Sequence, residues 1–459
     1  MVDPRLKELT GTRRREFLKW SATVAALLGL ERSRFLDVLS STSGSAMADE
    51  GACGKTSKSV HLIAGNGGLA WFTQLFPHPA VAKSGNNQVS YYGSAADVKD
   101  APTDMPSVYG KYSPFQTLGK SKQMTMFIAG TNQTHTNTPN TGLQLGNNGL
   151  IASIASIQSA NPSLLPVMAI NPFVFGTAPG APGVATVPNA KGLVDLFNSA
   201  ASKTILLDPK NASLSEAYYK AFLQLNAAAP RTSVTKTYDT GKVAANLLGK
   251  NLADQLAVLP ADDARYGITA STPTTIQEIG HALIIAIKAF KLGLTSSLVM
   301  PAMRDDPHGA FQNMQSLTNN VMALGKIFDA FMADALATPD PACQSRTLGD
   351  NIVFTITGDT TKDPLDRNGW GDGTQGNHNV VYAFSNGYLK TGWFGSVGLN
   401  QQVSTWNPQT GALVPGGNSG AMGTPAAAAI AFAVSKGDAR RVGDFGVTVP
   451  DGPINKTIM

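Results

Sequence analysis

The stretch 276–309, IQEIGHALIIAIKAFKLGLTSSLVMPAMRDDPHG, decides the fold class of this 459-residue chain. Its first half repeats large apolar residues at steps of three and four from Ile276 to Phe290, which predicts a helix with one buried face. The short apolar run Ser296–Met303 comes next and is typical of a buried strand. The polar residues 304–309 follow directly. A helix, a buried strand and a polar turn in this order form the repeating unit of a parallel α/β sheet.

The same pattern recurs along the chain. Four further short apolar runs, each followed by glycine or polar residues, lie at 59–64, 122–129, 164–170 and 351–357. A second helical repeat runs from Leu317 to Phe331. The sequence therefore predicts an α/β fold, a mostly parallel sheet sandwiched by helices, with ligands bound beyond the carboxyl ends of the strands. The Gly- and Pro-rich or polar segments 177–188 and 395–425 are expected to be surface loops.

Composition excludes several classes of protein. Apolar residues make up 42% of the chain and aromatic residues 7%, which a disordered chain does not have. Two cysteines exclude a disulfide-dense scaffold and a Cys-rich zinc module. The net charge is +5, but no block of Lys and Arg lies beyond residue 48. Nucleic acid is therefore not the expected partner, because phosphate binding needs a concentrated basic face.

The first 48 residues have the features of an export signal. Arg14 and Arg15 lead the sequence RREFLK, which resembles the twin-arginine export signal. The apolar run 20–30 that follows is too short to span a bilayer, which needs about 20 residues, so no permanent membrane span is expected. Ala46-Met47-Ala48 is a candidate cleavage site. An amphipathic amino-terminal helix with a chance basic cluster is the alternative.

The export signal has consequences for the rest of the chain. The resemblance implies a signal peptide at 1–48, the twin-arginine export machinery as a partner, and a periplasmic or secreted protein. The remaining residues, 49–459, are expected to form a single domain with long loops. Cys53 and Cys343 could pair in an oxidising compartment, and two free thiols are the alternative.

Asp306 and His308 form the sharpest candidate site. They lie two residues apart, so that in an extended segment both side chains point the same way. A carboxylate beside an imidazole suits a divalent metal such as zinc or manganese. The same residues also fit a loop salt bridge in which Asp306 caps the next helix.

Two other polar segments follow predicted strands. Asp359 and His378 bound a glycine-rich stretch that loosely resembles an oxygen-rich calcium loop without the spacing of a helix-loop-helix site, so a solvated polar loop is the alternative. Thr134 and Thr136 flank a histidine, and a hydroxyl beside an imidazole can become a nucleophile, although threonine is also a common turn residue. His281 lies in the apolar helix and is expected to be a core residue.

Taken in order, four segments resemble the exported bacterial family known as domain of unknown function 1501, in the alkaline phosphatase and sulfatase superfamily. They are the opening strand with its glycines (62–69), FIAG followed by Thr134-His135 (127–135), DPHG (306–309), and Gly358-Asp359 with GNHN (376–379). The resemblance implies an alkaline phosphatase-like fold. In the superfamily, Asp and His residues hold two metals that polarise a phosphate or sulfate ester and lower the pKa of a Ser or Thr nucleophile.

Carried onto this chain, the resemblance implies an exported hydrolase of phosphate or sulfate esters. Asp306, His308 and His378 would hold a divalent metal (zinc, manganese or calcium), with Asp359 nearby. Thr134 stands where the family has its serine and is the expected nucleophile, with Thr136 in reserve.

Departures from the family pattern favour an alternative function. Gly67 replaces an acidic residue, Asp359 replaces a glutamate, and Asn377 replaces an aspartate. An amide is a weaker ligand than a carboxylate, so one metal would lose much of its affinity. The alternative is a non-catalytic exported protein on the same fold, one that binds an unknown ligand or acts at a surface. A third alternative is a redox protein that is loaded in the cytoplasm before twin-arginine export, although no iron–sulfur or haem ligand pattern supports it.

Overall fold

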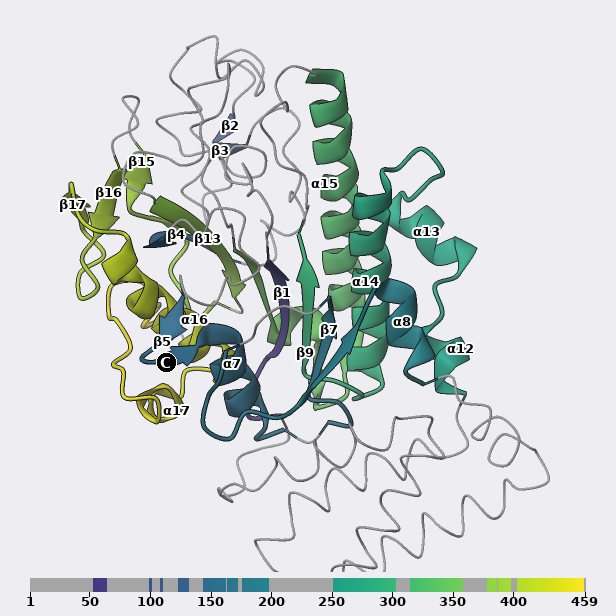
Figure 1. Cartoon of the computed structure of the whole chain (residues 1–459), viewed down its shortest axis with the longest axis horizontal. Helices are drawn as coiled ribbons and strands as arrows, with labels where there is room; N and C mark the ends of the chain where they lie inside the picture. Colours follow the sequence, from purple (N-terminus) through teal and green to yellow (C-terminus); the bar gives the residue numbers. More distant parts are fainter. Residues whose placement is uncertain are drawn as a thin grey trace, which may run out of the picture.

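The structure is a computed structural model (Figure 1). It describes residues 53–63, 99–100, 108–109, 123–131, 143–161, 163–171, 176–197, 251–302, 314–357, 378–385, 387–397 and 403–457.

A mixed sheet of eight strands forms the centre of the described part of the chain. Across the sheet the order is β14-β4-β13-β12-β1-β9-β7-β8. Every neighbouring pair is parallel except the two pairs made by β13, so β13 alone runs against the other seven strands. The predicted mostly parallel sheet is confirmed. The strands are β1 (Lys58–Ile63), β4 (Gln123–Thr131), β7 (Val167–Ile170), β8 (Val184–Val187), β9 (Ser297–Pro301), β12 (Ile352–Thr357), β13 (His378–Ser385) and β14 (Gly392–Phe394).

Helices cover both faces of this sheet, as predicted (Figure 1). The helices of one face are α8 (Ala190–Asp195), α12 (Leu252–Leu256), α13 (Pro260–Tyr266), α14 (Thr274–Lys291) and α15 (Met314–Ala337). The helices of the other face are α7 (Leu150–Gln158), α16 (Gly423–Val434) and α17 (Ala439–Gly443). The two predicted helices correspond to α14 and α15.

Strand alternation divides the core between the two faces. In β1, Val60 and Leu62 point to the α14–α15 face, and His61 lies on the opposite face because successive side chains of a strand alternate. The α14–α15 face is filled by large side chains, among them Phe354, whose ring lies 5.4 Å from the ring of Phe328 in α15. His281, expected in the core, is instead partly exposed on α14, with its Nε2 2.9 Å from Asp263 Oδ1.

The face under α7 and α16 combines an alanine-rich helix with a small aromatic group, Phe127, Phe394 and Trp406. Residues 426–434 of α16, AAAAIAFAV, are all buried, so this helix has no exposed face along that stretch. Alanine permits this because it lets the helix approach the sheet and the surrounding segments closely. The carboxyl-terminal segment packs on it through Val442 and Ile454.

Two segments expected to be surface loops contain strands. The segment 177–188 includes β8, which pairs with β7 at the edge of the sheet. The segment 395–425 includes β15 (Ser396–Val397), β16 (Val403–Trp406), β17 (Leu413–Pro415) and η8 (Gly420–Met422). These strands are short and flanked by Gly and Pro, which hides their alternation. Trp406 anchors the second segment, because its buried Nε1 donates to the Ile128 carbonyl at 3.2 Å.

Three further strand pairs complete the described elements. They are β2 (Lys99–Asp100) with β3 (Val108–Tyr109), β5 (Gln144–Leu145) with β6 (Asn148–Gly149), and β10 (Pro339–Asp340) with β11 (Cys343–Thr347), and η7 (Leu348–Asn351) leads from β11 into β12.

Candidate functional site

The carboxyl edge of the sheet is where the fold brings the candidate segments together. Thr131, the last residue of β4, pairs with His378, the first residue of the reversed strand β13. Further along the same edge, Thr357 pairs with Ile63, and Ile63 pairs with Pro301 at the end of β9. Strands β4, β13, β12, β1 and β9 are consecutive neighbours. Their ends therefore form one row with a spacing of about 4.8 Å between strands.

Most of the candidate residues follow these strand ends but are not themselves described by the structure. Thr134, Thr136, Asp306, His308 and Asp359 lie outside the described residues. Of His378 the structure describes the backbone, which begins β13. The segments that carry the other candidates follow β4, β9 and β12, and the ends of these three strands lie in the row.

Ser419 and Trp406, which the sequence did not indicate as important, fix the end of β4. Gly130 has a φ of 85°, a left-handed conformation that glycine adopts without strain. Its N–H donates to the Ser419 carbonyl and its own carbonyl accepts from Ser419 Oγ, both at 2.9 Å. Trp406 holds the carbonyl two residues earlier. These contacts set the direction in which the chain leaves β4.

Neighbouring strand ends are fixed by backbone hydrogen bonds. The Ala302 N–H, just past β9, donates to the Ile63 carbonyl at 2.8 Å. Asn171, just past β7, has a φ of 66° and donates its N–H to the Val187 carbonyl. Asparagine is one of the few side chains that tolerate this conformation. Regular pairing therefore continues to the last residues of these strands.

His61 lies two residues inward from the end of β1. Its imidazole is fully buried, and Nδ1 lies 2.7 Å from Oγ1 of Thr355, its neighbour on β12. Burial lowers the pKa of His61 to about 3, so the ring is neutral at physiological pH. Within the described structure its Nε2 has no hydrogen-bond partner. The sequence did not predict the contact between His61 and Thr355, because His61 lies in an apolar run that indicates only a buried strand.

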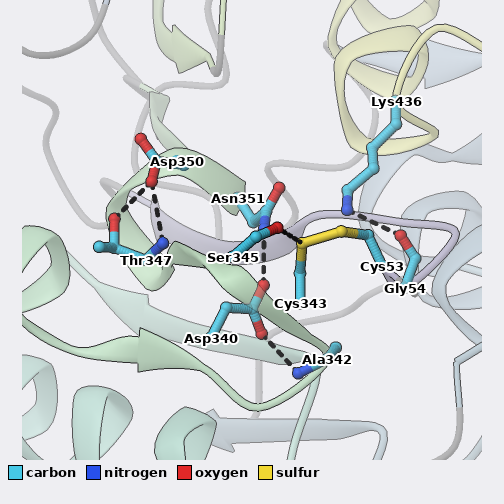
Figure 2. Close-up of a disulfide and its surroundings, with 10 residues drawn as sticks. All are labelled: Cys53, Gly54, Asp340, Ala342, Cys343, Ser345, Thr347, Asp350, Asn351 and Lys436. Atoms are coloured by element: carbon cyan, nitrogen blue, oxygen red, sulfur yellow. Dashed lines mark hydrogen bonds between the residues drawn. A yellow bond between two sulfur atoms is a disulfide. The ribbon is translucent and has the colours of Figure 1, made fainter. Parts of the chain in front are cut away.

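The opposite, amino-terminal edge of the sheet carries a disulfide. Cys53, five residues before β1, is bonded to Cys343 at the start of β11, 290 positions later in the chain (Figure 2). For this pair the sequence left open a disulfide or two free thiols, and the structure contains the disulfide. It ties the beginning of the described structure to the β10–β11 hairpin.

The described part of the chain lacks a metal-binding cluster and a membrane-spanning helix. It contains no cluster of three or more His, Cys, Asp or Glu side chains that could hold a metal. None of its helices combines the length and the apolar character that crossing a bilayer requires. The signal residues Arg14 and Arg15 lie outside the described residues.

Comparison with known proteins finds no matching family model, no matching curated protein and no matching solved structure.

Proposed function

We propose that this chain is an exported, metal-dependent hydrolase of phosphate or sulfate esters on an alkaline phosphatase-like sheet. The observation that carries the proposal is the row of strand ends at the carboxyl edge, in which β4, β13, β12, β1 and β9 are neighbours. The chain leaves this row two residues before Asp359, three before Thr134 and five before Asp306. The fourth candidate segment begins at His378, which is itself paired within the row.

The topology of the sheet supports the fold part of the proposal. Numbered along the chain, the eight strands stand in the order 4-3-5-1-6-7-2-8, and the seventh alone is reversed. A mostly parallel sheet of eight strands with helices on both faces is compatible with the proposed fold. The reversed strand also puts the beginning of β13, rather than its end, beside the carboxyl ends of its neighbours.

The proposed ligands fit a transition metal by their chemistry. Asp306, His308 and His378 together offer one carboxylate and two imidazoles, the donor set that zinc and manganese accept. A metal held there would polarise the ester and lower the pKa of a nearby hydroxyl. Thr134 would supply that hydroxyl, with Thr136 in reserve, and Asp359 would lie beside the metal.

The test is a metal measurement on the mature protein, residues 49–459, purified without chelator. We expect about one transition metal per chain and hydrolysis of chromogenic phosphate or sulfate esters. His308→Ala should lose both the metal and the activity. His281→Ala is the matched control, because His281 lies on α14 beside Asp263 and should leave both unchanged. A metal-free protein that is inert to a panel of these esters would contradict the proposal.

The alternative function is a non-catalytic exported binding or surface protein. Gly67 and Asn377, which replace two acidic residues of the family pattern, favour it. A correctly folded protein without metal or esterase activity would select this alternative.

Export is tested separately. Changing Arg14 and Arg15 to Lys should leave the precursor in the cytoplasm, because the twin-arginine machinery reads that pair. Unimpaired secretion of the double variant would contradict the export signal and with it the periplasmic or secreted location.

A further inference from the structure

We propose that Cys53 is a thiol–disulfide exchange site, and that the bond between Cys53 and Cys343 opens and closes on the folded protein. The exchange partner is a thiol or disulfide, either a small molecule or a protein dithiol. The inference rests on the contacts at the amino-terminal edge of the sheet (Figure 2) and is independent of any hydrolase activity.

The segment that carries Cys53 is held in place without the sulfur bond. The Gly54 N–H donates to the Ala342 carbonyl at 2.8 Å, and the Gly54 carbonyl accepts from Lys436 Nζ at 2.7 Å. Asn161, just after α7, accepts from the Lys55 N–H and donates to Thr56 through its amide. Three separate parts of the fold thus position this segment through hydrogen bonds alone.

The next residue extends this anchorage. The Ser57 N–H donates to the Val434 carbonyl at the end of α16, and the Ser57 carbonyl accepts from Gln158 Nε2 of α7. Both contacts are made at the point where β1 begins. Breaking the disulfide therefore leaves the start of β1 attached to α7 and to α16.

The hairpin that carries Cys343 is equally well held. Buried Asp340 accepts from the Ala342 N–H through one carboxylate oxygen and from Asn351 Nδ2 through the other. Asn351 is also buried and immediately precedes β12. Folding alone therefore brings the two sulfur atoms together.

The two cysteine residues differ in exposure. Cys343 is 1% exposed, whereas Cys53 is partly exposed. An incoming thiolate therefore reaches Cys53 first. The Ser345 hydroxyl lies 3.6 Å from Cys343 Sγ and can donate to that sulfur when it leaves as a thiolate.

Charged side chains lie beside the segments that carry the two cysteines. Lys58 and Lys436 both interact electrostatically with the buried carboxylate of Asp340, and Arg346 interacts with Lys436. Lys436 also contacts the carbonyl of the residue after Cys53. Positive surroundings lower the pKa of a thiol and raise the fraction present as the reactive thiolate.

The exchange balances as two displacements. In the opening direction, an external thiolate attacks Cys53 Sγ, forming a mixed disulfide and releasing Cys343 as a thiolate. A second external thiolate then displaces Cys53 and takes away the first as an external disulfide. The protein disulfide is reduced to two thiols, two external thiols are oxidised to one disulfide, and the two protons that those thiols give up are taken up by the protein thiolates. Closing is the reverse.

The first test uses glutathione as the probe. Reduced glutathione should open the bond without denaturant, and the reduced protein should keep its near-UV circular dichroism. Oxidised glutathione should then close the bond again. The equilibrium constant for closing should be at least about 100-fold larger in buffer than in urea, because the unfolded chain must close a long loop to bring the two cysteines together. Resistance to reduction without denaturant, loss of the native spectrum on reduction, or equal constants in buffer and urea would each overturn the proposal.

The second test identifies the reactive sulfur and holds even if the reduced wild type proves fragile. Cys343→Ser leaves Cys53 free, and Cys53→Ser leaves Cys343 free. Mass spectrometry should show that oxidised glutathione modifies the first variant at least about tenfold faster than the second, because Cys343 is buried. Equal rates, or faster modification of Cys343, would refute the assignment of Cys53.

A charge variant tests the electrostatic part. Lys436→Gln, combined with Cys343→Ser, keeps a hydrogen-bond donor near Gly54 and removes one positive charge. Modification of Cys53 at neutral pH should slow several-fold. Lys456→Gln is the matched control, because Lys456 pairs with Asp451 in an exposed ion pair. An unchanged rate in the Lys436→Gln variant would show that the positive charge of Lys436 does not contribute to the reactivity of Cys53.

Discussion

The two faces of the central sheet bury their residues in different ways. Under α14 and α15, large aliphatic and aromatic side chains fill the space, and rings from β12, β13 and α15 contact one another. Under α7 and α16, alanines bring one helix close, and polar side chains of the strands stay buried, His61 and Thr355 among them. Both faces derive stability from apolar burial. The second depends in addition on the close fit of α16 and on completed hydrogen bonds.

Polar contacts also mark where the second face meets the rest of the fold. Gln158 of α7 donates through Nε2 to Ser59 Oγ and to the Ser57 and Ser296 carbonyls. Ser59 in turn donates to Ser297 Oγ on the neighbouring strand. The difference between the faces therefore predicts different consequences for mutation on each.

The largest effect is expected on the α14–α15 face. Phe354→Ala removes a ring that contacts Phe328, Phe331 and Phe384. The free energy of unfolding should fall by about 4 kcal/mol, because the cavity in a packed aromatic cluster cannot collapse fully. Urea denaturation measures it. A loss below about 1 kcal/mol would show that this face repacks easily and would weaken the comparison.

On the other face, enlarging a buried side chain should lower the free energy of unfolding. Ala429→Leu adds volume to a fully buried position of α16 and should cost about 2 kcal/mol through overpacking. Ala439→Leu is the control, because Ala439 is exposed at the start of α17 and its replacement should change stability by no more than about 0.5 kcal/mol. Similar urea midpoints for the two variants would mean that α16 is not closely fitted.

The buried imidazole should make the second face sensitive to acid. His61 has its pKa lowered from 6.5 to about 3, so below pH 6.5 the unfolded chain binds a proton that the folded chain does not. Its contribution to stability is complete above pH 6.5 and is lost as the pH falls toward 3, by about 1.4 kcal/mol per pH unit.

Two variants isolate this contribution. Urea titrations at pH 7, 6 and 5 should give a shallower decline for His61→Gln than for the wild type, because Gln does not titrate. Thr355→Val removes the hydrogen-bond partner but keeps the imidazole buried, so its decline should match the wild type. Parallel declines for wild type and His61→Gln would show that the imidazole takes up a proton in the folded protein.

The smallest effect is expected where a single hydrogen bond closes the end of β4. Ser419→Ala removes the hydroxyl that donates to the Gly130 carbonyl and should lower the free energy of unfolding by about 1 kcal/mol. The backbone bond from Gly130 to Ser419 remains. An unchanged free energy of unfolding would indicate that a water molecule replaces the hydroxyl at the end of β4.

Much of the sheet could be predicted because its central strands are nearly continuous apolar runs. The run 351–357 corresponds to β12, and the run 296–303 corresponds to β9. β8 was missed because four residues at the edge of a sheet, flanked by Pro and Gly, give too short a pattern. β13 was missed because its first residue, His378, follows a long polar stretch.

The candidate site could be predicted only as a set of segments. Their order along the chain suggested one location, but nothing local indicates which strands are neighbours. The contacts of Ser419 and Trp406 with β4 join residues nearly 300 positions apart, 289 and 278 respectively, so no local pattern could have marked them.

By itself the sequence determined the α/β class and the helices and strands with strong periodicity, because that pattern depends on residues a few positions apart. It also narrowed any disulfide to one pair, since the chain has two cysteines. Only the tertiary structure decided that β1 lies between β12 and β9, that β13 is reversed, and that His61 is buried against Thr355. Those features arise from packing between distant segments, and the free energy that selects one strand order belongs to the whole core rather than to any one stretch of chain.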